Sequence, residues 1–363
     1  MVHSIDDLLR DLVGKEASDL HLKAGQPPVM RIHGDLVRAD YPSLSESEAK
    51  NLLESLLTEE RKERLYSERE LDLSYYVQGL ARFRVNMFFQ RHKLGAVFRV
   101  IPYKIRSIDE LRMPQVCKKL ALLPRGLILV TGPTGSGKST SLAAMISHIN
   151  TSSKCHIMTI EDPIEYVHAD INSIVNQREL GTDTFAFHEA LRHVMRQNPD
   201  VILVGEMRDL ETIQLAITAA ETGHLVLSTL HTVDSAQTID RIVDVFSPDQ
   251  QAQIRTQLSV TLQGIVSQTL LPTKDGKGRV GGFEAMVVTP SIRTLIRDGK
   301  THQLYSDIQM GGEFGMQTLD GDLLRLVKDG VVEYELALSR ASQPSEFIRR
   351  AQNAGVAEAA VSA

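Results

Sequence analysis

The stretch of sequence that decides the fold runs Leu127-Ile-Leu-Val-Thr131 and continues as Gly132, Pro133, Thr134, Gly135, Ser136, Gly137, Lys138, Ser139 and Thr140. A short, unbroken apolar run of this kind indicates a strand that is buried on both faces of a parallel sheet. The residues after it fit the pattern G-x-x-x-x-G-K-[ST], which marks a phosphate-binding loop when a strand precedes it and a helix follows. The sequence therefore predicts an α/β domain that binds a nucleotide.

The residue types of this loop suit a triphosphate. Glycines let the backbone wrap a phosphate so that successive N–H groups point inward, and the helix that follows adds the positive end of its dipole. In such loops the lysine, here Lys138, reaches the β- and γ-phosphates, and the next hydroxyl, here Ser139, ligates Mg²⁺. We therefore expect a nucleoside triphosphate and Mg²⁺ at residues 132–140.

Other apolar runs extend this core. Residues 156–160, 201–204 and 225–230 predict three more buried strands, and residues 210–220 predict a helix that ends at Gly223. Alternating strands and helices imply an α/β core with a parallel sheet. Helical patterns dominate after about Pro248.

The first hundred residues predict a smaller mixed unit of helices and strands. Apolar positions have helical spacing over 8–13 and again over 49–57, where Ser45 and Glu48 form a capping-box signature and the charged residues 59–70 continue the helix. Alternation over 82–90 predicts a strand and residues 96–101 predict its partner, with Gly95 in the turn between them.

Composition sets limits on function. A chain of 363 residues corresponds to two domains of roughly 150 residues. The formal charge of −6 argues against a general nucleic-acid clamp, which needs a basic face. No apolar run approaches the roughly 18 residues of a membrane-spanning helix. Cys117 and Cys155 are too few for a disulfide framework or a four-thiolate zinc site, as expected in a reducing, intracellular compartment.

Domain boundaries follow from the same patterns. We expect an N-terminal domain over residues 1–101 and a linker over 102–124, where prolines interrupt short helical stretches. The nucleotide-binding domain then covers residues 125–345, and an Ala-rich flexible tail covers 346–363.

Carboxylates follow two of the predicted strands, which we expect beside the phosphate-loop strand. The run Asp200-Val-Ile-Leu-Val-Gly205-Glu206 has the form of a Walker B strand, so Glu206 could hold the metal's water shell or polarise the attacking water. Its alternative role is to cap the next helix. Glu161 ends the strand 156–160 and Glu165 follows one short turn later, and both are candidate bases. The sequence does not choose between them.

Histidines and arginines add further candidates. His231 emerges where the strand 225–230 ends, so it could read a γ-phosphate, whereas His224 lies at the strand's opposite end. Arg82 and Arg84 share one face of a predicted strand, and Arg99 lies on the next strand. A solvated sheet face explains these arginines, but a P-loop core often needs a positive group in trans, which can be worth about a thousandfold in rate.

Four motifs in this order resemble the secretion ATPases of type II secretion and type IV pilus systems. They are the loop 132–140, the acidic box 159–165, the strand ending at Glu206 and the histidine box 223–232, and the similarity extends to Ala17-Ser-Asp-Leu-His-Leu22. Within the family the chain is most similar to the pilus retraction ATPases. It has no long extra N-terminal domain and no four-cysteine insertion. Residues 291–298 (SIRTLIRD) are similar to the retraction-associated segment AIRNLIRE.

The resemblance implies a homohexameric motor that hydrolyses ATP to retract a pilus. Each subunit would combine a PAS-like N-terminal α+β domain with a RecA-like P-loop ATPase domain and a helical C-terminal region, with ATP and Mg²⁺ between the domains. An inner-membrane platform protein would hold the ring at the cytoplasmic face of that membrane. The implied catalytic residues are Glu206, Glu161, Glu165, His231, Arg82, Arg84 and Arg99, with Arg112 a further candidate arginine, and the implied metal ligands are Ser139 and Glu206, directly or through water.

Other functions share parts of this pattern. An accessory retraction paralogue, a pilus-assembly ATPase or a type II secretion ATPase would carry the same motifs. A nucleic-acid translocase predicts a basic channel and DNA-stimulated hydrolysis, which the acidic balance disfavours. A regulatory switch that hydrolyses almost nothing is disfavoured by the three glutamates.

Overall fold

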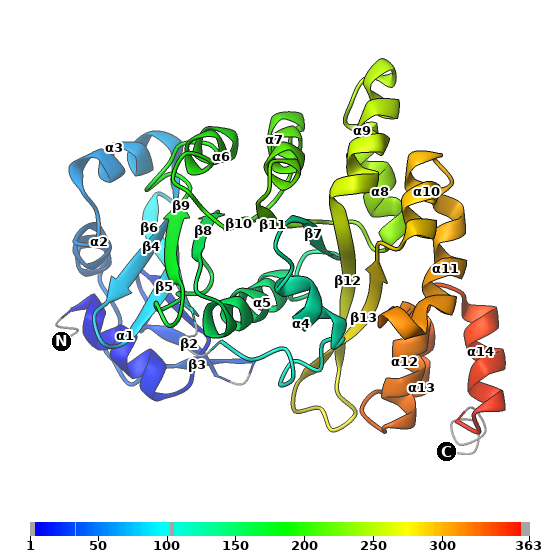
Figure 1. Cartoon of the computed structure of the whole chain (residues 1–363). Helices are drawn as coiled ribbons and strands as arrows, with labels where there is room; N and C mark the ends of the chain where they lie inside the picture. The colour runs from blue at the N-terminus through cyan, green and yellow to red at the C-terminus, as the bar shows by residue number, and fades with distance from the viewer. Residues whose placement is uncertain (1–3, 33, 102–104, 357–363) are drawn as a thin grey trace. The chain divides into compact units, whose positions relative to one another are not determined.

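The computed structural model describes residues 4–32, 34–101 and 105–356 (Figure 1). The chain divides into two compact units. The N-terminal unit contains the residues up to 104 together with the short segment Pro163–Val167. The second unit contains Ile105–Asp162 and the residues from His168 onward.

The N-terminal unit is built on a six-stranded sheet in the order β3-β2-β1-β6-β5-β4, in which neighbouring strands are antiparallel. Buried side chains such as Leu20, Phe83 and Phe98 share one core with the apolar faces of the helices. The elements are α1 (Ile5–Gly14), β1 (Asp19–Lys23), β2 (Val29–Ile32), β3 (Asp35–Arg38), α2 (Glu46–Glu54), α3 (Glu59–Glu68), β4 (Glu70–Val77), β5 (Ala81–Gln90) and β6 (Lys93–Ile101).

The turn between β5 and β6 differs from the prediction. Gly95 lies inside β6, where a Cβ atom would come within 3.2 Å of the carbonyl oxygen of Leu22 on β1. Glycine therefore allows the close approach of the two backbones there. The turn itself is made by Arg91 and His92, whose φ angles of 47° and 64° are left-handed.

The two helices after the third strand also differ in part from the prediction. The capping box of Ser45 and Glu48 is present at the start of α2. The charged residues after it do not continue that helix, because α2 ends at Glu54 and the side chain of Thr58 caps a separate helix, α3. A second N-cap in a charge-rich stretch thus divides one expected helix into two.

The second unit contains a seven-stranded sheet in the order β13-β12-β7-β11-β10-β8-β9. All neighbouring pairs are parallel except β12 and β13, which are antiparallel. The central strands β7, β10 and β11 are buried at every residue, as their continuous apolar runs predict. The strands are β7 (Gly126–Thr131), β8 (His156–Glu161), β9 (Ile174–Glu179), β10 (Val201–Val204), β11 (Leu225–Leu230), β12 (Leu262–Pro272) and β13 (Arg279–Val287).

Helices cover both faces of this sheet (Figure 1). Alternate residues of β7 show the division, because Ile128 and Val130 pack with α4 and α5, whereas Leu127 and Leu129 pack with α6 to α10. These helices are α4 (Val116–Ala121), α5 (Lys138–Ser152), α6 (Phe187–Val194), α7 (Leu210–Glu221), α8 (Ser235–Asp244), α9 (Pro248–Thr261) and α10 (Pro290–Arg297).

The predicted linker is largely part of the second unit. Ile108, Met113 and Cys117 are buried in the same core as the sheet, and α4 contributes Leu120 to it. Residues 108–121 therefore do not form a free connector, because most of their apolar side chains pack in the core on one face of the sheet. Residues 102–104 of the predicted linker lie outside the described residues.

The C-terminal end is helical as predicted, but the helices extend further than expected. A small core forms around Leu271, Leu323 and Phe347. Phe347 is 1% exposed on α14, so the prediction of a flexible tail was wrong for residues 346–353, and residues 357–363 lie outside the described part of the chain. No helix of the described residues is both long enough and apolar enough to cross a membrane. The C-terminal elements are η1 (Thr301–Gln303), α11 (Leu304–Met310), η2 (Gly311–Phe314), α12 (Leu319–Lys328), α13 (Tyr334–Arg340) and α14 (Pro344–Asn353).

Candidate active site

The predicted phosphate-binding loop joins β7 to α5, the strand and helix that its motif requires. Gly132 has φ = 143° and Gly137, the N-cap of α5, has φ = 92°. A Cβ atom at Gly132 would lie 2.2 Å from the backbone oxygen of Gln268 and 2.7 Å from the Oγ of Ser136. Any larger residue at Gly132 would therefore displace the loop, and the glycine is required by both conformation and space.

Gln268 on β12 hydrogen-bonds to this loop, and the sequence motifs did not indicate it as a site residue. Its Nε2 donates to the backbone oxygen of Ser136 at 2.6 Å, and its side chain is 4% exposed. Ser136 is also buried, and its Oγ has no hydrogen-bond partner among the described residues. A buried hydroxyl without a partner in this loop fits a ligand oxygen, so the loop suits a phosphate.

Lys138 connects the loop to the neighbouring strand end. Its Nζ donates to the backbone oxygens of Gly132 at 2.8 Å and Pro133 at 3.2 Å, and it lies 3.4 Å from Nδ1 of His231. When a nucleotide binds, this ammonium group can donate to phosphate oxygens in place of the carbonyl oxygens, and the fold need not change.

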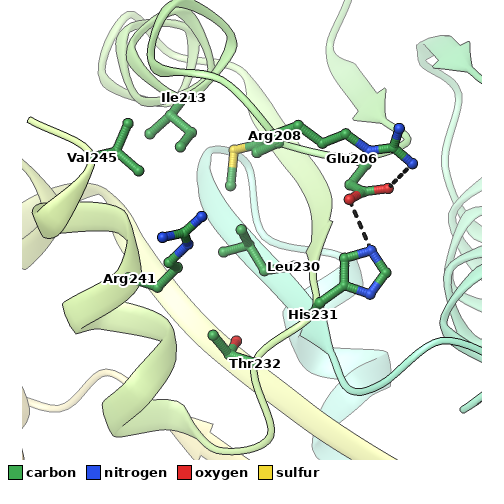
Figure 2. A pocket seen from close by; sticks show the side chains of 9 residues that line it. Glu206, Arg208, Ile213, Leu230, His231, Thr232, Arg241 and Val245 are labelled. Atoms are coloured by element: carbon green, nitrogen blue, oxygen red, sulfur yellow. Dashed lines mark ion pairs between the residues drawn. The ribbon is translucent and has the colours of Figure 1, made fainter.

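Glu206 forms the centre of a charged cluster directly beyond β10. Its Oε1 lies 2.8 Å from Nε2 of His231 and its Oε2 lies 2.8 Å from Nη2 of Arg208, as the dashed lines of Figure 2 show. Burial raises the pKa of Glu206, but the hydrogen bond from Arg208 and the positive charge of His231 outweigh it and leave the pKa below its ordinary value. The carboxylate is therefore ionised at neutral pH. Arg208 is a partner that the sequence motifs did not indicate.

A cavity of about 400 Å³ adjoins this cluster. Glu206, Arg208 and His231 contribute polar groups to its lining, and Ile213 and Val245 contribute apolar ones (Figure 2).

The strand order corrects two expectations. The strands that flank β7 are β11 and β12, so neither β10 nor β8 lies beside the phosphate-loop strand. His231 nevertheless bridges the gap, because it follows β11, the strand between β7 and β10. The structure thus brings Lys138, His231 and Glu206 into one chain of contacts from three strand ends.

Glu161 lies at the end of β8, next to the end of β10. A Cβ atom at Gly205 would come within 3.3 Å of the Cα of Glu161, so the glycine before Glu206 permits the two strand ends to approach. The Oε1 of Glu161 accepts hydrogen bonds from Oγ1 of Thr159 at 2.6 Å and from Nε2 of Gln177 at 3.0 Å. Neither donor was predicted from the sequence.

Several predicted residues lie elsewhere. Glu165 belongs to Pro163–Val167, a segment of the N-terminal unit, whereas Glu161 and Glu206 belong to the second unit. Asp209, not Glu206, caps α7, since its Oδ1 accepts from the N–H of Thr212 at 2.8 Å. The capping alternative for Glu206 is therefore excluded.

His224 has a structural environment. Its Nδ1 lies 2.9 Å from the backbone oxygen of Ala219 and its backbone N–H donates to the same oxygen at 3.1 Å. It therefore closes the C-terminal end of α7, while His231 at the other end of β11 contacts Lys138 and Glu206.

The candidate arginines lie in the N-terminal unit. Arg84 and Arg99 are directly opposite each other on β5 and β6, and both are exposed. Arg99 pairs with buried Asp19 at 2.8 Å. Burial raises the pKa of Asp19, but hydrogen bonds from Ser18 and Arg99 outweigh it and lower the pKa. Arg82 precedes Arg84 on the same face of β5, so the three cations share one side of the sheet.

The segment that resembles the retraction motif forms α10. Ile292 and Ile296 are buried, whereas Arg293 is exposed. The side chain of Thr289 caps the helix by accepting from the N–H of Ile292. One face of α10 therefore packs on the core and the other presents Arg293 to solvent.

Comparison with known proteins gives a consistent result. A sequence model of the family described as "Type II/IV secretion system protein" matches residues 1–335. The chain is 51% identical over 343 residues to a type IV pilus retraction ATPase, PilT, of Pseudomonas aeruginosa, with 94% of this chain and 99% of that protein covered. It is 47% identical to a twitching motility protein of Neisseria gonorrhoeae, covering 94% of this chain and 91% of the relative.

Solved structures agree with the sequence relatives. A crystal structure of the pilus retraction motor PilT with bound ADP matches with a TM-score of 0.90 and 46% identity, covering 95% of this chain and 99% of that one. The predicted fold class, an N-terminal α+β domain followed by a RecA-like ATPase domain, is confirmed by this match, and so is the resemblance to secretion ATPases.

Proposed function

The chain belongs to the type II/IV secretion system protein family, and we propose that it is an ATPase motor that drives retraction of a type IV pilus. The observation that carries this proposal is the chain of contacts from Lys138 of the phosphate-binding loop through His231 to Glu206. It occurs in a chain that is 51% identical, over nearly its whole length, to a pilus retraction ATPase.

The substrate of the proposed reaction is ATP. The loop amides and the N-terminus of α5 bind its phosphates, and Lys138 supplies positive charge to the β- and γ-phosphates. Ser136 and Gln268 hold the loop in the shape that this requires.

Ser139 and Glu206 would hold Mg²⁺, directly or through water. The described residues contain no group of three or more His, Cys, Asp or Glu side chains placed to bind a metal ion. One hydroxyl and one carboxylate still fit this ion, because Mg²⁺ in nucleotide sites usually takes one or two protein ligands and completes its shell with phosphates and water. The bound ion would supply positive charge that stabilises the transferring phosphoryl group.

The environments of Glu161 and Glu206 support different roles. Glu206 contacts both Arg208 and His231, and its lowered pKa makes it a weaker base. Thr159 and Gln177 donate to Glu161 and orient its carboxylate at the end of β8. We therefore propose that Glu161 orients the attacking water and that Glu206 helps to hold the Mg²⁺ ion. Glu165 in the N-terminal unit remains a candidate for either step if the domains close.

The N-terminal unit would supply the positive charge that completes the site. Arg82, Arg84 and Arg99 share one face of its sheet, and an arginine at the γ-phosphate stabilises charge in the transition state. The proposed active form is a homohexamer in which a PAS-like domain over 1–101 moves against the ATPase domain. Its partner would be an inner-membrane platform protein that brings the ring to the cytoplasmic face of that membrane, and no nucleic acid is involved.

Gene deletion tests the proposed direction of the motor. If the chain retracts pili, cells without it should carry more pili than the wild type and lose twitching motility, because filaments still assemble but are not withdrawn. Electron microscopy and a motility-plate assay measure both effects. Bald cells would show an assembly ATPase instead, and piliated, motile cells would show an accessory paralogue.

Complementation with Arg293→Ala separates hydrolysis from retraction in the same strain. Arg293 is exposed on α10, so its loss should leave the fold and ATP turnover within about twofold of the wild type while motility stays absent. Exposed Arg279, at the start of β13, provides a matched control whose alanine variant should restore motility. Loss of both turnover and motility in Arg293→Ala would place α10 in the ATPase machinery.

A further inference from the structure

Gln177 hydrogen-bonds to Glu161 from the neighbouring strand. It lies on β9, directly opposite Thr159 of β8 in the parallel register, and it is half-buried. Alternate residues of a strand share a face, so Thr159 and Glu161 both lie on the face that Gln177 shares. A neutral amide beside a carboxylate at the end of a buried strand is a costly arrangement unless each polar atom has a partner.

The side-chain amide of Gln177 makes two hydrogen bonds of opposite kind. Its Nε2 donates to Oε1 of Glu161 at 3.0 Å, and its Oε1 accepts from the backbone N–H of His168 at 2.8 Å. These two partners fix the orientation of the amide, because a carboxylate only accepts and a backbone N–H only donates. A rotation of the amide by half a turn would lose both bonds.

His168 marks the end of a loop that begins beside Glu161. Asp162 follows Glu161 directly, and the segment between Asp162 and His168 is the one that belongs to the N-terminal unit. The chain joins one end of this segment to Glu161 through Asp162. At the other end, the backbone N–H of His168 donates to Gln177, which in turn donates to Glu161.

Thr159 completes the arrangement. Its Oγ1 donates to the same oxygen of Glu161 at 2.6 Å, and Thr159 itself is fully buried. Two donors from two strands converge on one carboxylate oxygen, which restricts the rotation of the Glu161 side chain. The second donor, from Gln177, depends on the placement of His168 as well.

We propose that Gln177 is a positioning residue that sets the orientation of the Glu161 carboxylate for catalysis and couples that orientation to the segment Pro163–Val167. The inference rests on the proposed function, since it requires that Glu161 acts on the water that attacks ATP. Gln177 itself need not touch the nucleotide.

Two variants distinguish the hydrogen bond of Gln177 to Glu161 from its hydrogen bond to His168. In Gln177→Glu, measured at pH 8.5, a carboxylate oxygen can still accept from His168 but cannot donate to Glu161, and it adds a like charge. In Gln177→Met both hydrogen bonds are lost with little change of volume. A hydrogen bond to a charged group corresponds to roughly tenfold to a hundredfold in rate, so kcat of ATP hydrolysis should fall by that factor in both variants, and further in Gln177→Glu, while KM changes less than about threefold.

Asn176→Ala is the matched control. Asn176 is the exposed neighbour on β9, and its side chain contacts His156 on the opposite face. Its loss should leave kcat unchanged, and oligomer size and thermal midpoint should show that all variants are folded. If the amide served only to hold His168, Gln177→Glu would turn over like the wild type, which would overturn the proposal.

A double-mutant cycle with Glu161→Gln shows whether the effect passes through Glu161. If it does, Gln177→Met should reduce kcat in the wild type and leave the low rate of Glu161→Gln unchanged, since effects on one unit are not additive. Independent losses, or wild-type turnover in Glu161→Gln, would overturn the inference but leave the ATPase assignment intact. An inactive wild-type hexamer would overturn both.

Discussion

Replacing Lys138 by alanine should lower ATP turnover by a factor on the order of a hundred or more. In the structure its ammonium group lies over the loop carbonyls of Gly132 and Pro133 and 3.4 Å from His231, so it is already placed beside the phosphate-binding amides. Removing it takes away positive charge where negative charge develops on the leaving phosphate. A coupled phosphate-release assay at saturating ATP measures the effect.

The fold should tolerate this change. Lys138 begins α5 and is half-exposed, so the thermal midpoint should stay near that of the wild type. Lys154→Ala makes the same change of charge at an exposed position just after α5, and it should hydrolyse ATP normally. Wild-type turnover in Lys138→Ala would contradict the assignment of residues 132–140 as the phosphate site.

Replacing Glu206 by alanine should stop turnover while ATP still binds. The substitution removes the anion that faces His231 and Arg208, each at 2.8 Å, and leaves the positive charges of Arg208 and Lys138 in the site. Extra positive charge favours a bound polyphosphate, but without Glu206 the metal loses an anchoring carboxylate, so kcat should fall by about a hundredfold or more. Equilibrium binding of a fluorescent ATP analogue and phosphate release together report the two effects.

Glu211→Ala provides the control for this experiment. Glu211 lies on α7 of the same unit and pairs with Arg192 at the surface, so its loss removes a nearby carboxylate outside the cluster. Unchanged turnover in Glu206→Ala would remove Glu206 from the mechanism. Loss of ATP binding would instead assign it to holding the nucleotide.

The phosphate-binding loop could be predicted because its information is local. A buried strand, a glycine-rich turn and a helix occupy consecutive residues, and the glycine, lysine and hydroxyl positions of the motif all lie inside that short stretch. The carboxylates Glu161 and Glu206 could be predicted for a similar reason, because each directly follows a continuous apolar run.

The arrangement of the strands could not be predicted in the same way. β12, which flanks β7, comes from residues 262–272, more than a hundred positions later in the chain, and β11 separates β7 from β10. Strand order depends on how the crossover helices pack, which no single run of residues encodes. Gln177 and Gln268 were missed for this reason, since a glutamine within a strand has no functional signal until its neighbour on the next strand is known.

Local exceptions explain the remaining differences. The turn at Arg91 and His92 uses left-handed conformations without glycine, so turn chemistry pointed to Gly95 instead. The Ala-rich composition near the C-terminus concealed a helix that Phe347 anchors in a small core. In both places the packing of neighbouring elements outweighs local preference.

Calorimetric titration of Mg·ATP into the purified, folded chain tests the central claim most directly. If the loop that begins at Gly132 binds the phosphates, the heat of binding should saturate at one nucleotide per chain. The variant Gly132→Ala should show no heat of binding, because its added methyl group would lie 2.2 Å from the backbone oxygen of Gln268. No heat from the folded wild-type chain, or equal binding by Gly132→Ala, would contradict the account.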